Sequence, residues 1–153
     1  KNGQSKSRSI EVSKVMGELN YILNESQDYS IGVITFYKKQ ALDLQDEINK
    51  LSLQDQERIE VGTVDSFQGK EFDVVILSTV RSNNFKDKRR SVGFLDSRNR
   101  LNVAFSRGKR LVIVVGDAET VAYKDGTVVI KELHDFYQLC RKEGYCEQEL
   151  VHH

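Results

Sequence analysis

The sequence is poor in several residue types. In 153 residues it holds no proline, no tryptophan and only two cysteines. Cys140 and Cys146 fit neither a CxxC pair nor the disulfide framework of a small secreted domain, so we expect reduced thiols in a cytoplasmic, intracellular protein. No apolar run approaches the roughly 20 residues that span a bilayer, and no signal-peptide pattern opens the chain. These absences predict no membrane partner.

Net charge is missing as well. The 23 basic residues balance the 23 acidic ones, which excludes a wholly basic nucleic-acid arm and an acidic tail. The balance hides a local asymmetry, because residues 81–110 hold ten basic residues and only Asp87 and Asp96. A merely solvated charged face would contain interspersed acidic residues. An excess of eight positive charges in one segment therefore favours a phosphate-binding site.

Apolar residues recur at two spacings that together predict an α/β fold. The pattern predicts helices at 10–23, 41–51 and 131–142, and strands at 31–36, 59–64, 72–80, 111–115 and near 128–130. It also predicts a helix that Asp96 or Ser97 caps and that carries Leu101, Val103, Ala104 and Phe105. The runs at 72–80 and 111–115 are nearly continuous, which is typical of strands covered on both faces. Strands that alternate with helices indicate a parallel sheet flanked by helices on both faces.

The length suits one domain, since domains commonly run to about 100–150 residues. We expect the domain to cover 10–145, with 1–9 as a flexible terminus or boundary and 146–153 as a tail. The two terminal histidines are native sequence or the start of an affinity tag, so they carry no weight as ligands. His134 has no partner at metal or triad spacing, and no metal site is predicted.

The stretch 63–77 (TVDSFQGKEFDVVIL) carries the first candidate site. Small hydroxyl residues and a glycine follow a predicted strand, and ligands of open α/β sheets bind where such strands end. Gly69 and Lys70 are not a P-loop, because a Walker A motif needs glycine where Val64 stands and serine or threonine where Glu71 stands. A nucleotide bound here must therefore be shared with another domain.

The stretch 95–117 (LDSRNRLNVAFSRGKRLVIVVGD) carries the second candidate. On a helix, Arg100 and Arg107 can lie on one face. Arg107 comes just before Gly108, where its side chain can leave the domain. Arginine suits a transferring phosphoryl group because it is planar, always charged and bidentate, but it also complements a helix C-terminus. Taken alone, the spacing favours the role at a helix C-terminus.

Three stretches in matching order resemble known motifs. Residues 31–40 (IGVITFYKKQ) look like motif IV, 62–82 like motif V and 98–117 like motif VI of the second RecA-like domain of superfamily 1 helicases. The branch that the chain resembles includes the up-frameshift RNA helicase of nonsense-mediated decay and its DNA-helicase relatives. The resemblance covers about 9–118, and Phe36 departs from it, since the family usually has proline there.

The resemblance implies a RecA-like P-loop NTPase fold without a P-loop of its own, in the carboxyl-terminal motor domain of an ATP-dependent helicase. ATP with Mg²⁺ would be held mainly by the amino-terminal RecA-like domain of the same polypeptide, and the partner would be single-stranded DNA or RNA. Arg107 matches the catalytic arginine finger. The motifs place Gly69, Glu71, Arg100 and Gln68 at the nucleotide, and Thr35, Tyr37, Thr63, Asp65 and Ser66 at the nucleic-acid backbone. Glu71 is expected at the ribose hydroxyls, and Gln68 lies between the two sites.

Two other functions remain open. A stand-alone single-stranded nucleic-acid-binding module would use the basic segment without motor activity. A nuclease or small-molecule hydrolase is disfavoured, because the sequence has no clustered carboxylates and no histidine-based triad. Since Walker A and Walker B are missing, we predict that this chain alone does not hydrolyse ATP. The sequence does not discriminate DNA from RNA.

Overall fold

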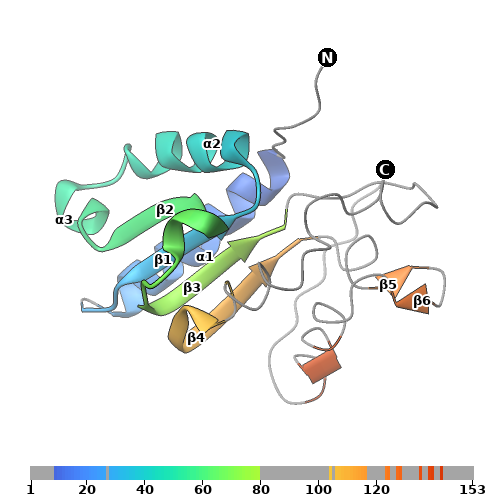
Figure 1. The fold of residues 1–153 in the computed structure, drawn as a ribbon. Coiled ribbons are helices and arrows are strands. Elements are labelled where there is room, and N and C mark those ends of the chain that lie inside the picture. The colour runs from blue at the N-terminus through green and yellow to red at the C-terminus, as the bar shows by residue number, and fades with distance from the viewer. Residues whose placement is uncertain are drawn as a thin grey trace.

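The computed structural model describes residues 9–26, 28–79, 104, 106–116, 123–124, 127–128, 135, 138–139 and 142. In this part of the chain a parallel four-stranded sheet has the order β2-β1-β3-β4 (Figure 1). Its strands are β1 (Ile31–Thr35), β2 (Ile59–Thr63), β3 (Phe72–Ser78) and β4 (Gly108–Val115). The predicted parallel α/β fold is confirmed.

Helices surround the sheet. They are α1 (Ser9–Glu25), α2 (Lys38–Ile48), the short α3 (Leu53–Gln56) and the 3-10 helix η1 (Val64–Phe67). A separate two-stranded antiparallel sheet is formed by β5 (Tyr123–Lys124) and β6 (Thr127–Val128). None of the described helices is both long and apolar enough to cross a bilayer.

One face of the sheet packs against α1 and α2, and α1 lies behind the sheet in Figure 1. Side chains alternate between the faces of a strand, so every second residue of β1 and β3 points into this core. The buried core residues on this side are Val15, Leu19, Ile22, Leu23, Ile31, Val33, Leu44, Ile48, Val74, Ile76 and Val115. This apolar layer fixes the strand register and hence the positions of both strand ends.

The other face carries η1, which lies in front of the sheet in Figure 1. Phe67 and Phe72 are buried there, edge to face, with ring centroids 5.4 Å apart. A Cβ atom at Gly32 would lie 2.7 Å from the Phe72 ring, and one at Gly62 would lie 2.5 Å from Ser66 Oγ. The aromatic pair and η1 therefore approach the sheet closely only because two positions in the strands lack a side chain.

The structure adds three elements that periodicity did not predict, namely α3, η1 and β5. Each has only two to four residues, too few to show a period. Leu111 in β4 is 47% exposed. The prediction that both faces of 111–115 are covered is therefore wrong at Leu111. The predicted helix that carries Arg100 lies largely outside the described residues, and the proposed domain boundaries at 10 and 145 stay predictions.

Candidate functional site

The candidate residues fall at opposite ends of the strands. Thr35 and Thr63 pair in register at the carboxyl ends of β1 and β2. Phe72 and Gly108 pair at the amino ends of β3 and β4. Of the described candidates for nucleotide binding, Gln68, Gly69 and Glu71 shortly precede Phe72, and Arg107 directly precedes Gly108. We call these two regions the carboxyl edge and the amino edge of the sheet. Motif V contributes to both, because it runs from one edge to the other through η1.

A tight turn forms the amino edge. The Lys70 N–H donates to the Phe67 carbonyl at 3.0 Å, Gln68 has φ −60° and ψ 126°, and Gly69 has φ +79°. These values define a type II turn, whose third residue needs a positive φ and is therefore usually glycine. A Cβ atom at Gly69 would meet nothing within 4 Å. The turn thus leaves its backbone open to a ligand.

Arg107 lies against this turn. Its N–H donates to the Ala104 carbonyl at 3.3 Å, and its carbonyl accepts from the Phe72 N–H at 2.8 Å. In the side chain, Nη1 donates to the Lys70 carbonyl at 3.1 Å, while Nε and Nη2 donate to Ser106 Oγ at 3.2 and 2.9 Å. The guanidinium therefore lies along the amino edge instead of extending away from the domain. Sequence reasoning gave no signal for the contact with Ser106.

Acidic and basic side chains alternate at the amino edge. Lys109 Nζ lies 3.8 Å from Glu71 Oε2, and Lys70 forms an ion pair with Glu60. The side chains of Glu71 and Lys109 are more than half exposed, so their attraction is weak and a ligand can displace it. Glu71 thus presents a carboxylate to solvent beside the turn.

The groups at this edge fit part of a nucleoside triphosphate. A guanidinium suits phosphate oxygens, an exposed carboxylate suits ribose hydroxyls, and the turn at Gly69 offers open backbone. Within the residues that the structure describes, no three histidine, cysteine, aspartate or glutamate side chains gather as a metal site.

Asp73 anchors the amino edge to β1. Its Oδ2 accepts from the Ser30 N–H at 2.9 Å and from Ser30 Oγ at 3.2 Å, and Oδ1 lies 3.4 Å from Arg110 Nε. The bond from the Ser30 N–H is the largest cause that lowers the pKa of Asp73 below its ordinary value, and Arg110 lowers it further. Arg110 also lies over the Tyr29 ring, 5.2 Å from its centroid. The carboxylate thus joins the amino-terminal ends of β1, β3 and β4.

At the carboxyl edge, Thr35 and Tyr37 are buried, at 0% and 2% exposure. The Tyr37 N–H lies 3.4 Å from Thr35 Oγ1, and the fully buried Gln40 donates from Nε2 to Ser78 Oγ at 3.1 Å. The role of Thr35 and Tyr37 at a nucleic-acid backbone stays a prediction. Their burial limits direct contact by these two side chains.

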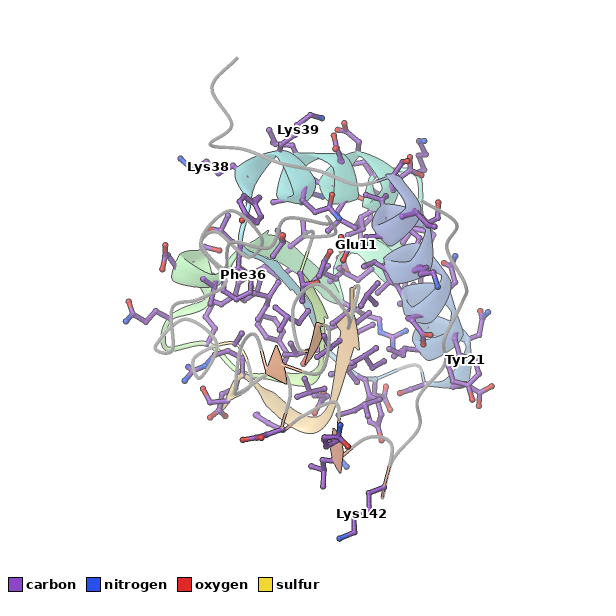
Figure 2. All side chains as sticks on the ribbon, turned by 90° about the vertical axis from the view of Figure 1, so that its right-hand side faces the viewer. Glu11, Tyr21, Phe36, Lys38, Lys39 and Lys142 are labelled. Atoms are coloured by element: carbon purple, nitrogen blue, oxygen red, sulfur yellow. The ribbon has the colours of Figure 1, made fainter. Side chains whose placement is uncertain are left out.

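The exposed groups after β1 are Lys38 and Lys39, which point outward at the start of α2 (Figure 2). No side chain caps the helix at Tyr37, and its first turn contains no acidic residue. Lysines at a helix N-terminus oppose the helix dipole. Lys39 also forms an ion pair with Asp43 one turn later, at 3.2 Å, whose attraction is weak because Lys39 is exposed. Sequence reasoning passed over the two lysines although they stand within the motif IV stretch.

At the end of β2, Asp65 and Ser66 are exposed and Thr63 is half-buried. Ser66 Oγ donates to the Thr63 carbonyl at 2.7 Å, so this hydroxyl is folded back over the strand end. Gln68 is exposed in the turn that follows η1. Thr63, Asp65 and Ser66, which are predicted to contact a nucleic-acid backbone, thus lie together at the carboxyl edge. Gln68 lies at the amino edge.

A buried polar contact closes the carboxyl ends of β3 and β4. Thr79 Oγ1 lies 3.4 Å from both Glu11 Oε1 and the Val115 carbonyl, and Glu11 is only 2% exposed. Figure 2 shows Glu11 on the inner side of α1. A Cβ atom at Gly116 would lie 1.9 Å from Thr79 Oγ1. The two strand ends therefore approach each other at a glycine.

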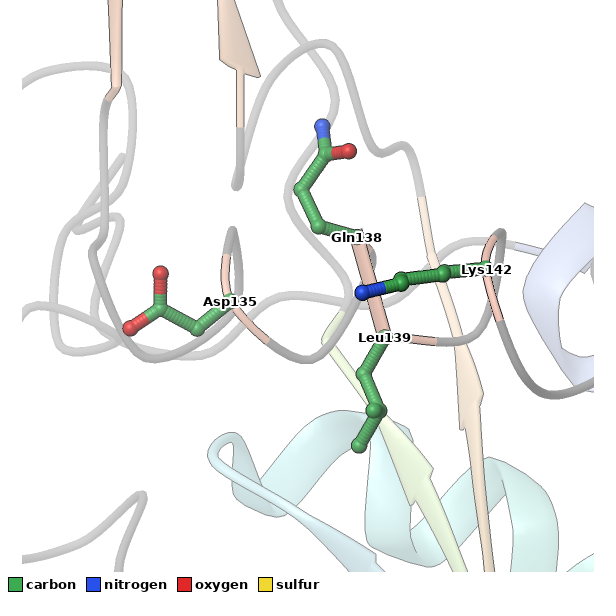
Figure 3. Close-up of a pocket in the computed structure, with 4 residues that line it drawn as sticks. All are labelled: Asp135, Gln138, Leu139 and Lys142. Carbon is green, nitrogen blue, oxygen red and sulfur yellow. The ribbon is translucent and has the colours of Figure 1, made fainter.

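Two further regions add no candidate. Arg100 and the basic residues 81–103 lie outside the described residues. An open cavity of about 630 Å³ is lined by Asp135, Gln138, Leu139 and Lys142 (Figure 3). None of its described lining residues belongs to the two edges.

Comparison with known proteins places residues 1–119 in the family described as AAA domain. The chain is 47% identical over 89 residues to the human "RNA helicase Mov10l1", which covers 57% of this chain and 7% of that protein. It is 48% identical over 93 residues to the "DNA polymerase alpha-associated DNA helicase A" of Saccharomyces cerevisiae, covering 60% and 13%. It is 41% identical over 95 residues to the "Regulator of nonsense transcripts 1" of Dictyostelium discoideum, covering 60% and 7%. The chain thus spans about a tenth of the length of these relatives.

Proposed function

The chain belongs to the up-frameshift-like helicases of superfamily 1, and from this membership we propose that it is the carboxyl-terminal motor domain of an ATP-dependent helicase. Such a domain supplies an arginine finger and part of an ATP pocket, and it binds the backbone of a single strand. The observation that supports this best is the position of Arg107, held beside the type II turn with Glu71 exposed next to it. An amino-terminal RecA-like domain completes the pocket.

On the nucleotide side, each group at the amino edge has one task. ATP with Mg²⁺ supplies a phosphoryl group on which negative charge develops during transfer. Arg107 stabilises that charge, an effect worth about 10³–10⁵ in rate for arginine fingers. Glu71 accepts hydrogen bonds from the ribose hydroxyls, and Gly69 lets the nucleotide approach the backbone. Arg100 supports the pocket.

On the nucleic-acid side, the carboxyl edge holds a strand by its phosphates. Lys38 and Lys39 supply positive charge after β1, and Thr63, Asp65 and Ser66 lie at the end of β2. Contacts of this kind position a strand without reading its sequence. One relative is named an RNA helicase and another a DNA helicase, so either strand is a substrate to test.

The rival is a stand-alone single-stranded nucleic-acid-binding module, in which Arg107 is one more phosphate contact. The two proposals differ in what the loss of Arg107 removes. The helicase proposal expects lost ATP turnover and near-normal strand binding, whereas the rival expects weaker strand binding alone. That the protein is intracellular remains a prediction, which rests on its two cysteines.

The test uses the two-domain polypeptide that joins an amino-terminal RecA-like domain to this chain. Steady-state ATP turnover with saturating single strand should fall at least about 10³-fold in Arg107→Ala, while the Kd for the strand changes less than about twofold. Arg110→Ala is the matched control, because it removes an arginine from the same edge and should leave turnover within about twofold. This chain alone should show no turnover with or without a strand. Unchanged turnover in Arg107→Ala would overturn the proposal.

A further inference from the structure

Ser106 holds the guanidinium of Arg107 from one side. Its Oγ accepts from Nε at 3.2 Å and from Nη2 at 2.9 Å. The Lys70 carbonyl accepts from Nη1 at 3.1 Å on the other branch of the guanidinium. All three guanidinium nitrogens are therefore engaged by the domain's own groups, and because the guanidinium is planar, these contacts fix its orientation as well as its place.

The backbone beneath Arg107 is fixed independently of the side chain. Its N–H donates to Ala104, which is fully buried, and its carbonyl accepts from Phe72 at the start of β3. Phe72 in turn is seated against Gly32 and Phe67. The remaining freedom of Arg107 lies in its side-chain torsions, and Ser106 and the Lys70 carbonyl restrict them from within the described part of the chain.

The Lys70 carbonyl owes its position to the turn. Gly69, with its positive φ, allows the type II turn in which the Lys70 N–H donates to the Phe67 carbonyl. A backbone acceptor cannot be removed by a side-chain substitution, so Ser106 is the testable half of this arrangement. Ser106 is exposed, and its replacement removes no buried group.

We propose that Ser106 is a positioning residue, which orients Arg107 for phosphoryl transfer before a nucleotide arrives. The inference rests on the proposed function, since it assumes that Arg107 acts on a transferring phosphoryl group. A charged group that is already oriented loses less freedom when the reaction needs it, which raises the rate of the chemical step. The rate constant kcat should therefore depend on Ser106 while nucleotide binding does not.

The test measures kcat and KM for ATP in the same two-domain polypeptide with saturating strand. Ser106→Ala should lower kcat about tenfold, an effect typical of one hydrogen bond to a charged group, and leave KM within about twofold. Ser106→Thr keeps the hydroxyl and should retain most of the activity. Ser106→Cys keeps the size with a weak acceptor and should resemble Ser106→Ala.

Two controls separate positioning from general structure. Ser52 is also an exposed serine whose Oγ accepts an N–H, from Asp55 at 3.2 Å, but it lies at the start of α3. Ser52→Ala should leave kcat unchanged. In an Arg107→Ala background, Ser106→Ala should cause no further loss, because a residue that acts through Arg107 has nothing left to orient.

The outcomes are distinguishable. If Arg107→Ala abolishes turnover while Ser106→Ala matches wild type, this inference is wrong and the proposed function stands. A raised KM with unchanged kcat in Ser106→Ala overturns it too, since Ser106 would then bind nucleotide directly. If Ser106→Ala does not fold, the comparison of Ser106→Thr with Ser106→Cys decides in its place. If Arg107→Ala keeps full turnover, the proposed function itself fails.

Discussion

The two edges of the sheet are built in opposite ways. At the amino edge, charged side chains are exposed around an open turn, and backbone groups hold them in place. At the carboxyl edge, the polar groups nearest the ends of β1 and β3 are buried and bonded to one another, and the exposed Lys38 and Lys39 follow Tyr37. At the end of β2, Asp65 and Ser66 are exposed. The first arrangement suits a ligand that must be oriented closely. The second suits a long polyanion that is held and released.

The difference between the two edges is tested most directly with variants of each edge in the two-domain polypeptide. Variants of one edge should affect strand binding, and variants of the other should affect turnover. The double variant Lys38→Ala/Lys39→Ala should weaken single-strand binding about fivefold and leave kcat at saturating strand unchanged, which is the reverse of the loss expected for Arg107→Ala. The slope of log affinity against log salt should become shallower by about 0.7 for each phosphate that the lysines no longer neutralise. Lys50→Ala, just beyond the carboxyl end of α2, is the control. An unchanged salt slope would contradict the assignment of the carboxyl edge.

The packing of Gly32 against Phe72 offers the next largest effect, on stability. In Gly32→Ala the new Cβ would lie 2.7 Å from the Phe72 ring, so we expect a loss of about 1–3 kcal/mol in the free energy of unfolding, measured by urea denaturation of this chain. Gly17→Ala is the matched control: its Cβ would meet nothing within 4 Å, and in the exposed interior of α1 it should stabilise by about 0.5–1 kcal/mol. Equal effects of the two would refute the close packing.

Gly69 tests whether the amino edge depends on its turn. Gly69→Ala forces an alanine to φ +79° in open space, so the expected cost in unfolding free energy is about 1 kcal/mol from backbone strain alone. Gly69→Asn should cost less, since asparagine tolerates this region better. Urea unfolding of both variants measures the difference. A variant pair with no loss would mean that the turn is not type II.

The smallest expected effect concerns Asp73 and pH. Its pKa is lowered in the folded protein, so its contribution to stability is full above the ordinary carboxyl range and is lost as pH falls through the folded pKa. Asp73→Asn should flatten the acid side of the curve of unfolding free energy against pH. An unaltered acid limb in Asp73→Asn would show that Ser30 and Arg110 do not favour the charged carboxylate.

The sheet could be predicted from the sequence because each strand and helix shows its pattern within a short stretch of the chain. The runs at β1 and β3 are β-branched and continuous, and helical spacing located α1 and α2 to within a few residues. The sequence could not predict that Thr35 and Tyr37 are buried, since a polar and an aromatic residue after a strand suit a core or a ligand equally well. Nor could it predict the hydrogen bond between Arg107 and the Lys70 carbonyl, which joins residues 37 positions apart.

The close approach at the ends of β3 and β4 limits how related sequences can vary. Thr79 Oγ1 occupies the space in which a side chain at position 116 would begin. We expect the two positions to covary among homologues: where a larger residue replaces Gly116, position 79 should carry alanine or glycine. A pair of this kind can be sought in an alignment without any reference to catalysis, and its absence would mean that the backbones of the two strands separate in those proteins.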